Sequence, residues 1–455
     1  VTAAICEERL SRTKHDKSFP KRAIAFCVEY SGITYTDIDY VVFYEKPLRK
    51  FERILTTHIF HAPNGFKTFV KAMPIWLKER LDMKSTITKS LNELCHHRIK
   101  WDIRFVEHHL SHAAMAYFTS PFENAAILVV DAVGENATTS LFKAIDCKIE
   151  CIKQQSFPNS VGLLYSAFTY YLGFQVNSDE YKVMGLAPYG DLCAEQTQRF
   201  INIIKTKLVS IGDDGSIIIN QKYFTFMVGL RMVVDHVWAN LFGIAKRETD
   251  APIKTEHMNL AAAIQYVTEG IFLKLAAHIK ALTKCNNICI SGGCALNCAA
   301  MGKIKASGLY SGVFIPFAPG DDGGAIGAAL AFYALASGKR CMPNVSPYQG
   351  CCFRNEEVEK TLKDEKLEFS FLQGDNLYDK IAVSLSHGNI IGWFQGRMEF
   401  GPRALGNRSI LADPRDPSMK DRINAKVKYR ETFRPFAPVV TQDDASRFFE
   451  DSNSP

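Results

Sequence analysis

The sequence predicts an α/β protein with one large domain made of two similar halves and a smaller α/β domain after it. Two apolar segments carry this prediction: Ala126–Val130 leads into Asp131 and a turn with Gly134, and Asn287–Ile290 leads into Ser-Gly-Gly at 291–293. Each is typical of a buried strand entering a turn of small residues. Backbone N–H groups in such turns can approach a phosphate closely. One such junction would be an ordinary βα connection, but two favour a duplicated nucleotide-binding architecture around a cleft.

Length and composition limit the class of protein. The chain has 455 residues, 47% hydrophobic and 22% charged, which is the range of folded globular proteins with about three domains. A net charge of +6 over this length is too dilute to indicate a nucleic-acid surface. Thirteen cysteines, an odd number, indicate reduced thiols in a cytoplasm. Cys285, Cys289, Cys294 and Cys298 raise a zinc hypothesis, but the interleaved isoleucines favour core packing.

The chain has no segment that we expect to span a membrane. Its longest uncharged apolar run, 325–336, is well short of the roughly 20 residues that cross a bilayer, and it follows two glycines. We therefore expect a buried helix there. No basic stretch followed by an apolar one opens the chain, and Val1 stands where Met would, which we interpret as processing or truncation.

The texture of the sequence changes near residue 346. Residues 341–350 hold two prolines and a glycine, typical of a linker, and 356–366 form a strongly charged stretch expected to be helical. An apolar run at 389–394 predicts a further strand. We therefore expect a large domain over 1–345 and a second one over 346–455.

Two histidines form the sharpest local signal. His108 and His112 stand four residues apart, so on a helix both imidazoles share one face and can share a metal. His109 occupies the position where a zinc protease needs Glu, which disfavours that class. Asp321, where a glycine-rich turn enters the expected 325–336 helix, is the best third ligand, and this set suits Fe(II), Mn(II) or Zn(II). The alternatives are capping histidines and an acid that caps the helix.

Arginines cluster among glycine, proline and phenylalanine at 396–409 and 429–438. An exposed helical face would instead pair them with acids four residues away. Guanidinium groups held by rigid turns suit the recognition of phosphate. A groove for nucleic acid is the alternative, but the aromatic residues are not arranged as a stacking platform.

Together these segments resemble the carbamoyltransferases of the nodulation-factor and aminoglycoside-antibiotic type. The resemblance runs in order along nearly the whole chain. It implies an actin-like ATPase domain, akin to the threonylcarbamoyl-transfer enzyme of tRNA modification, followed by a carbamoyl-adenylate-forming domain. The resembling stretches are Cys6–Asp16, His108–Ala114, Asp131–Glu135, Ser178–Gly190, Ser291–Asn297, Gly320–Gly324 and Gly401–Ser409.

The resemblance implies a reaction in two stages. Carbamoyl phosphate loses phosphate and is adenylated by ATP, and a hydroxyl of a sugar or similar metabolite then attacks the carbamoyl-adenylate and expels AMP. The implied roles are Fe(II) ligands, with Zn or Mn as alternatives, nucleotide-binding residues, and arginines that bind carbamoyl phosphate. These sets are, in turn, His108, His112 and Asp321; Asp131, Gly134, Gly292, Gly293 and Asn297; and Arg403 and Arg434.

Several alternatives stay open. Glu180 and Lys182 could line the acceptor side, although an ordinary surface ion pair explains them equally well, and no residue stands out as a general base. Competing functions are the tRNA threonylcarbamoyl-transfer enzyme and an actin-like or chaperone-like ATPase, whose Mg²⁺ is held by oxygens rather than histidines. Family members begin before the position of Val1 and continue past Pro455, so we expect a fragment that binds metal but turns over poorly. Oligomeric state is left open.

Overall fold

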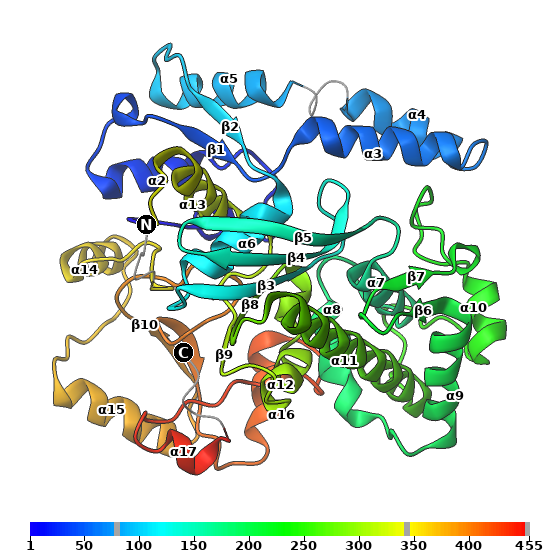
Figure 1. Ribbon diagram of the computed structural model, residues 1–455. Coiled ribbons are helices and arrows are strands. Elements are labelled where there is room, and N and C mark those ends of the chain that lie inside the picture. The colour runs from blue at the N-terminus through cyan, green and yellow to red at the C-terminus, as the bar shows by residue number, and fades with distance from the viewer. Residues whose placement is uncertain (77–81, 341–345, 451–455) are drawn as a thin grey trace. The chain divides into compact units, whose positions relative to one another are not determined.

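The computed structural model describes residues 1–76, 82–340 and 346–450, which form two compact units (Figure 1). Unit 1 comprises the described residues of 1–35 and 346–450, and unit 2 comprises those of 36–340. The sequence-based division at 345/346 instead places 1–35 in the larger domain. That division rests on a change of amino-acid composition along the chain, and such a change carries no information about where the N-terminal segment packs.

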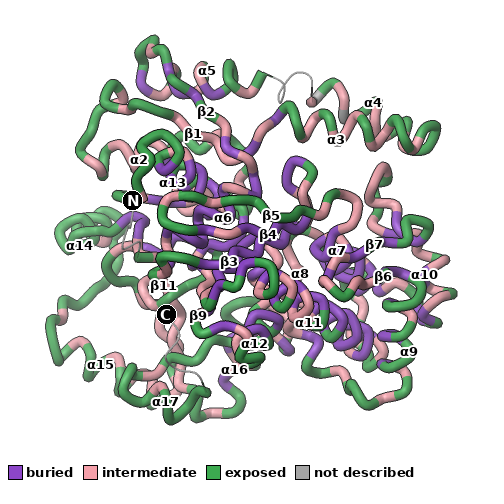
Figure 2. Tube along the Cα trace, viewed as in Figure 1, coloured by how far each residue is buried: buried purple, intermediate pink, exposed green. Residues whose placement is uncertain are grey.

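Unit 2 is organised around a five-stranded sheet in the order β5-β4-β3-β8-β9. β3 pairs antiparallel with β4 and parallel with β8, and β8 pairs parallel with β9. β3 is apolar and fully buried from Ala125 to Val130, as its purple colour in Figure 2 shows. The strands are β3 (Asn124–Val130), β4 (Ala137–Ile145), β5 (Lys148–Ser156), β8 (Asn287–Ser291) and β9 (Gly312–Phe314).

This topology corrects one sequence-based interpretation. Both predicted strands form, as β3 and β8, but they are neighbours in one sheet, with Val129 opposite Ser291. They therefore do not mark two separate halves. Because parallel strands end at the same edge of a sheet, the turns after Val130 and Ser291 meet there. Sequence separation could not reveal this pairing.

Three helices define the surroundings of that edge. The helix expected over 325–336 is confirmed as α13 (Gly324–Ser337), and it packs against α6 (His108–Phe118), which also contacts β3 and β8. The core helix α11 (Thr255–Thr283) is the one described helix long and apolar enough to cross a membrane, with 67% of its most apolar window buried. The apolar pattern of the sequence did not indicate this helix, because Glu269 and Lys274 interrupt its apolar run.

The other elements of unit 2 surround this core. Two short strand pairs lie outside the main sheet: β1 (Val41–Phe43) with β2 (Ile103–Phe105), parallel, and β6 (Val209–Ile211) with β7 (Ile217–Ile219), antiparallel. The helices are α3 (Pro47–Phe60), α4 (Phe66–Ile75), α5 (Met83–Cys95), α7 (Val161–Tyr171), α8 (Glu180–Leu186), α9 (Glu195–Ile203), α10 (Asp235–Phe242) and α12 (Cys298–Ala306).

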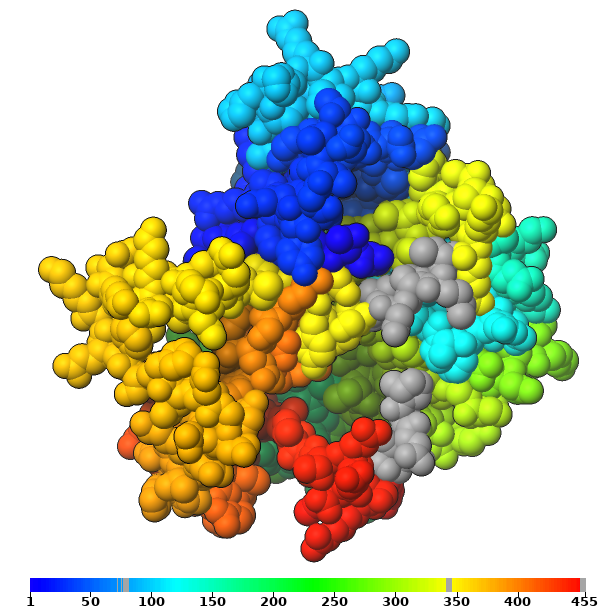
Figure 3. Space-filling model, turned by 90° about the vertical axis from the view of Figure 1, so that its left-hand side faces the viewer, coloured from blue at the N-terminus to red at the C-terminus, as the bar shows by residue number. Residues whose placement is uncertain are grey.

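Unit 1 joins the N-terminal segment to the C-terminal part of the chain. The Ala4 N–H donates to the Gln349 carbonyl at 3.1 Å. A small apolar core holds Ile5, Ala23, Cys351 and Met398. Figure 3 shows the blue N-terminal residues against the yellow and orange ones of this unit.

Two sequence predictions are confirmed in unit 1. The charged stretch forms helix α14, and the 389–394 run forms strand β10, which pairs antiparallel with β11. Part of the expected linker, 341–345, lies outside the described residues. The elements are α1 (Glu7–Ser11), α2 (Lys21–Ser31), α14 (Asn355–Asp364), α15 (Asp375–Ser386), β10 (Ile391–Phe394), β11 (Arg408–Leu411), α16 (Met419–Ile423) and α17 (Ala445–Phe448).

Candidate metal centre

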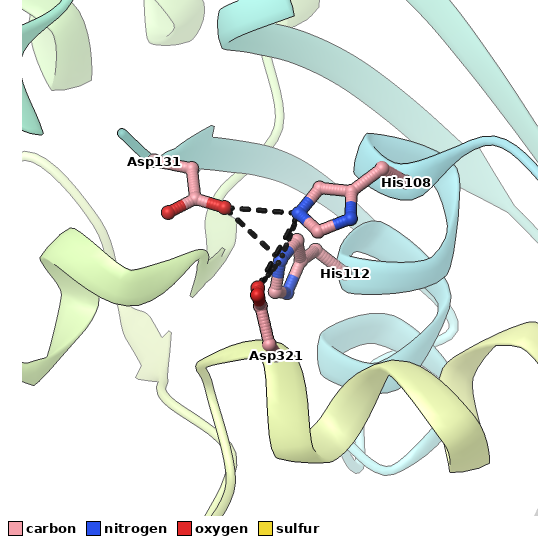
Figure 4. A group of neighbouring side chains, drawn as sticks. All are labelled: His108, His112, Asp131 and Asp321. Carbon is pink, nitrogen blue, oxygen red and sulfur yellow. Dashed lines mark hydrogen bonds and ion pairs between the residues drawn. The ribbon is translucent and has the colours of Figure 1, made fainter. Parts of the chain in front are cut away.

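Helix α6 brings two imidazoles together. His108 and His112 are both buried, and their Nε2 atoms lie 3.1 Å apart (Figure 4). The first turn of α6 is anchored because the His108 N–H donates to both oxygens of the Glu135 carboxylate, at 3.0 and 3.2 Å. The expected helical face is thus confirmed.

Two carboxylates from other elements complete the group. Asp131, at the end of β3, places Oδ2 3.0 Å from His108 Nε2 and 3.4 Å from His112 Nε2. Asp321, in the turn before α13, places Oδ1 3.4 Å from each of the same nitrogens. One donor atom from each of these four residues lies within 4.8 Å of the others, and they form the only such group found among the described residues. The four cysteines of the zinc hypothesis are not part of it.

These spacings fit a divalent metal ion. Ligands about 2.1 Å from a metal lie about 3.0 Å apart at right angles and about 3.4 Å apart in a tetrahedron. In the structure, the separations that involve histidine run from 3.0 to 3.4 Å. Imidazole nitrogen with carboxylate oxygen suits Fe(II), Mn(II) and Zn(II). Asp131, expected to bind nucleotide, is here a fourth member of the group.

The charges of the group explain its shifted pKa values. Burial opposes a charged imidazole at His108, but hydrogen bonds to Asp131 and Asp321 outweigh it and raise the pKa of His108 to about 10. The pKa of His112 is raised by the same balance. Burial works against ionisation of Asp131 and Asp321, yet the two histidines lower the pKa of both carboxyls. The imidazoles and the carboxylates therefore stabilise one another's charged forms.

His109 belongs to a different environment although it neighbours His108 in the chain. Its Nδ1 lies 2.6 Å from the Ser140 hydroxyl, away from the group. Burial lowers the pKa of His109 to about 3, so this imidazole is neutral. His109 is a matched control for His108, because it is as buried as His108 but contributes no donor to the cluster.

The second oxygen of Asp131 links the ends of β3 and β8. Asp131 Oδ1 accepts from the backbone N–H of Ala132 at 2.7 Å and of Gly293 at 3.4 Å. Gly292 makes this approach possible: its φ is +91°, and a Cβ there would lie 2.2 Å from the Val130 carbonyl oxygen. The predicted residues Asp131, Gly292 and Gly293 are thus in one place.

We expect Gly292→Ala to destabilise the protein by about 3 kcal/mol or more, because the side chain combines positive-φ strain with a clash against β3. Thermal or denaturant unfolding measures this. The matched control is Gly302→Ala in α12, where a Cβ meets nothing within 4 Å and φ is helical. That change should stabilise by up to about 1 kcal/mol. Equal stability of the two variants would contradict the role given to Gly292.

The other two predicted nucleotide residues, Gly134 and Asn297, have different contacts. Gly134 lies beside the cluster, since a Cβ there would be 3.0 Å from the His108 ring. The side chain of Asn297 caps α12 by accepting from the Ala300 N–H at 3.1 Å and makes a reciprocal amide pair with Gln265, at 2.9 and 3.0 Å. Its polar atoms are thus engaged within the protein, which the sequence pattern did not indicate.

Glu180 and Lys182 do not form an ion pair with each other. The Glu180 carboxylate accepts from the Ser166 hydroxyl at 2.7 Å and from the Asn177 N–H at 2.9 Å. Lys182 Nζ lies 3.1 Å from the Asp179 carboxylate. Both side chains therefore have local partners.

The two predicted arginines lie in unit 1. Arg403 is exposed in the loop between β10 and β11, and Arg434 is half-buried, 3.6 Å from the Glu431 carboxylate. The Arg403 loop folds around buried Glu399, whose Oε1 accepts from the N–H groups of Leu405 at 2.7 Å, Asn407 at 2.8 Å and Arg408 at 3.1 Å. Burial opposes ionisation of Glu399, but these backbone donors lower its pKa.

This arrangement predicts a pH-dependent stability. Because the folded-state pKa of Glu399 is below its ordinary value, the stabilisation is present above that ordinary value and is lost as the pH falls through the folded-state value. We expect Glu399→Gln to cost about 2 kcal/mol at pH 7. The gap in melting temperature from wild type should narrow as the pH falls below the ordinary pKa of a glutamate. A gap that persists unchanged in acid would contradict this role for the carboxylate.

Two protein-family models match this chain. Residues 1–330 match the family described as Carbamoyltransferase N-terminus, and residues 382–455 match Carbamoyltransferase C-terminus. An uncharacterized protein of Synechocystis sp. is 44% identical over 100% of this chain and 74% of its own length. The nodulation protein NolNO of Sinorhizobium fredii is 35% identical over 99% of this chain and 62% of its own length.

A further nodulation protein is similar to this chain. The nodulation protein NolO of Bradyrhizobium diazoefficiens is 37% identical over 76% of this chain and 60% of its own length. The chain thus spans less than two thirds of the two nodulation proteins. Among solved structures, HypF of T. kodakarensis aligns over 56% of this chain and 39% of its own at 15% identity, with a TM-score of 0.28, too low to bear on the fold. The family matches, by contrast, cover most of the sequence, and the chain belongs to the carbamoyltransferase family.

Proposed function

We propose that this protein is a metal-dependent O-carbamoyltransferase that uses carbamoyl phosphate and ATP through a carbamoyl-adenylate. The observation that carries the proposal is the convergence of two imidazoles and two carboxylates at the end of β3, in a chain of the carbamoyltransferase family. The proposed acceptor is a hydroxyl of a sugar or another small metabolite. The proposed location of the protein is the cytoplasm.

His108, His112, Asp131 and Asp321 would hold the metal, for which Fe(II) is the proposed ion. When bound, the metal supplies a positive charge that stabilises the negative charge developing on a departing phosphate. Asp131 has a double role, because its other oxygen holds the Gly293 turn in place. Gly134, Gly292, Gly293 and Asn297 are the proposed nucleotide-binding residues beside the metal, and Asn297 also caps α12.

Unit 1 would form the adenylate. Arg403 and Arg434 bind carbamoyl phosphate, and Glu399 fixes the backbone of the Arg403 loop. There, water releases phosphate from carbamoyl phosphate, and the carbamate attacks the α-phosphate of ATP and expels pyrophosphate. In unit 2 the acceptor hydroxyl then attacks the carbonyl carbon and expels AMP. Glu180 and Lys182 are the proposed residues on the acceptor side.

Beyond the α/β class, we propose a more specific fold for unit 2. We propose that unit 2 is one half of a duplicated actin-like ATPase with elements of the other. The five-stranded sheet β5-β4-β3-β8-β9 makes up that one half, and the parallel pair β1–β2 belongs to the other. This division would replace the simple repetition inferred from the two strand segments.

Radiolabelled carbamoyl phosphate tests the function. With ATP and a panel of hydroxyl-bearing sugars, label should move to an acceptor, with AMP and pyrophosphate released in equal amounts. Omitting the acceptor should still allow pyrophosphate to exchange into ATP when carbamoyl phosphate is present. ADP as the sole nucleotide product, without label transfer, would indicate an ATPase of the actin or chaperone type and overturn the proposal.

A further inference from the structure

Arg53, on α3, has an unusual environment close to the metal centre. Its guanidinium donates to the Gly134 carbonyl at 3.3 Å and lies over the Phe157 ring, 5.2 Å from the centroid. Gly134 in turn packs directly against His108, where an added Cβ would lie 3.0 Å from the ring. The Arg53 guanidinium therefore contacts Gly134 in the turn between β3 and β4, and Gly134 in turn contacts His108 of the metal centre.

Arg53 has no carboxylate of its own. Among the described residues no acid lies within ion-pair distance of it, and the two nearby acids are engaged elsewhere. Glu45 pairs with Lys50 Nζ at 2.7 Å. Glu135 accepts from the N–H groups of His108 and of Lys46, the latter at 2.8 Å. Glu45 and Glu135 thus stabilise the charge of Arg53 only through space, and no carboxylate of the described residues hydrogen-bonds to its guanidinium, which leaves that group able to bind an external anion directly.

The remaining donors of Arg53 are available. None of its nitrogens is among the buried side-chain atoms without a partner, so the N–H groups that do not reach Gly134 are in contact with solvent. The neighbouring cations differ, because Lys46 Nζ and Arg49 both pair with Glu107. Burial lowers the pKa of Arg53 to about 10, which leaves it charged at neutral pH.

We propose that Arg53 binds a phosphate group over the β3–β4 turn, beside the metal centre. A guanidinium that is fixed by a carbonyl on one side and by an aromatic ring on its face presents its free edge in a defined direction, as phosphate recognition requires. The inference deepens the proposed function, because the nucleotide would be the source of that phosphate. Carbamoyl phosphate carries the same chemical group and is distinguished by the test.

The experiment compares Arg53→Gln with Arg49→Gln, a matched control one turn earlier on α3. Titration calorimetry on the full 455-residue chain with Mn(II) bound gives dissociation constants for ADP, adenosine, carbamoyl phosphate and inorganic phosphate. We expect Arg53→Gln to weaken ADP binding about tenfold or more and adenosine less than twofold. Arg53→Lys should fall between, and Arg49→Gln should change neither. Carbamoyl phosphate weakened in place of ADP would identify it as the bound species.

The outcomes separate this inference from the proposed function. Unchanged binding of every phosphate compound by Arg53→Gln overturns the inference and leaves the function standing. Equal weakening of ADP and adenosine also overturns it, because that result indicates a structural role. Binding of phosphate that depends on Arg53, in a protein that releases only ADP from ATP and transfers no carbamoyl label, supports the inference and overturns the function. A wild-type protein that binds no phosphate compound overturns both.

Discussion

Replacing His108 with glutamine is expected to reduce the metal content of the purified protein at least tenfold. The substitution removes one of four converging donors and leaves the Glu135 contact to the His108 backbone N–H intact, so α6 should still form. An amide oxygen is a far weaker ligand than an imidazole nitrogen for Fe(II), Mn(II) or Zn(II). Metal content per chain, measured by mass spectrometry after purification and after reloading, gives the result.

His109→Gln is the control for that experiment. This side chain occupies the same turn of α6 and is equally buried, but it faces Ser140. The variant should retain most of the wild-type metal. Its circular dichroism and melting temperature, compared with those of His108→Gln, separate loss of a ligand from loss of the helix. Wild-type metal content in His108→Gln would rule out the ligand assignment.

Asp131 offers the second large effect, and two substitutions separate its two roles. In Asp131→Asn an oxygen can still accept from the N–H groups of Ala132 and Gly293, while the group facing the histidines becomes an amide that binds metal poorly. Asp131→Ala loses both functions. We expect both variants to lose metal at least tenfold, whereas only the alanine variant should also lose the backbone anchors, at a cost of about 3 kcal/mol.

Metal content and thermal unfolding of the metal-free proteins measure the two roles separately. Metal-free protein is needed for the stability comparison, because a bound ion stabilises the folded state by itself. Equal metal content in wild type and Asp131→Asn would show that Asp131 serves only the turn. Equal stability of the asparagine and alanine variants would show that the two backbone contacts contribute little.

Local structure near the site could largely be predicted from the sequence. The strands that became β3 and β8, the helix carrying His108 and His112, and the α13 helix after Asp321 all follow from apolar runs, histidine spacing and small residues. Each depends on neighbours within a few turns of chain, which is the range over which propensity and periodicity act. Helix α11 was missed because its charged residues obscure an otherwise buried face.

Contacts between segments that lie far apart in the chain could not be predicted from the sequence. Nothing near Arg53 in the chain indicates that its guanidinium reaches Gly134, or that Glu45 and Glu135 are engaged by other groups. Glu399 gave no signal either, because three backbone N–H groups around a carboxylate leave no residue pattern.

The sequence by itself determined the α/β class, the histidine pair on one helical face, and, through its resemblance, the family. Only the tertiary structure decided that β3 and β8 are neighbours, that Asp131 shares a centre with His108, His112 and Asp321, and that residues 1–35 belong with unit 1. The physical reason is that parallel pairing and core packing join segments far apart along the chain. The free energy of such contacts depends on complementary surfaces, which local sequence patterns do not encode.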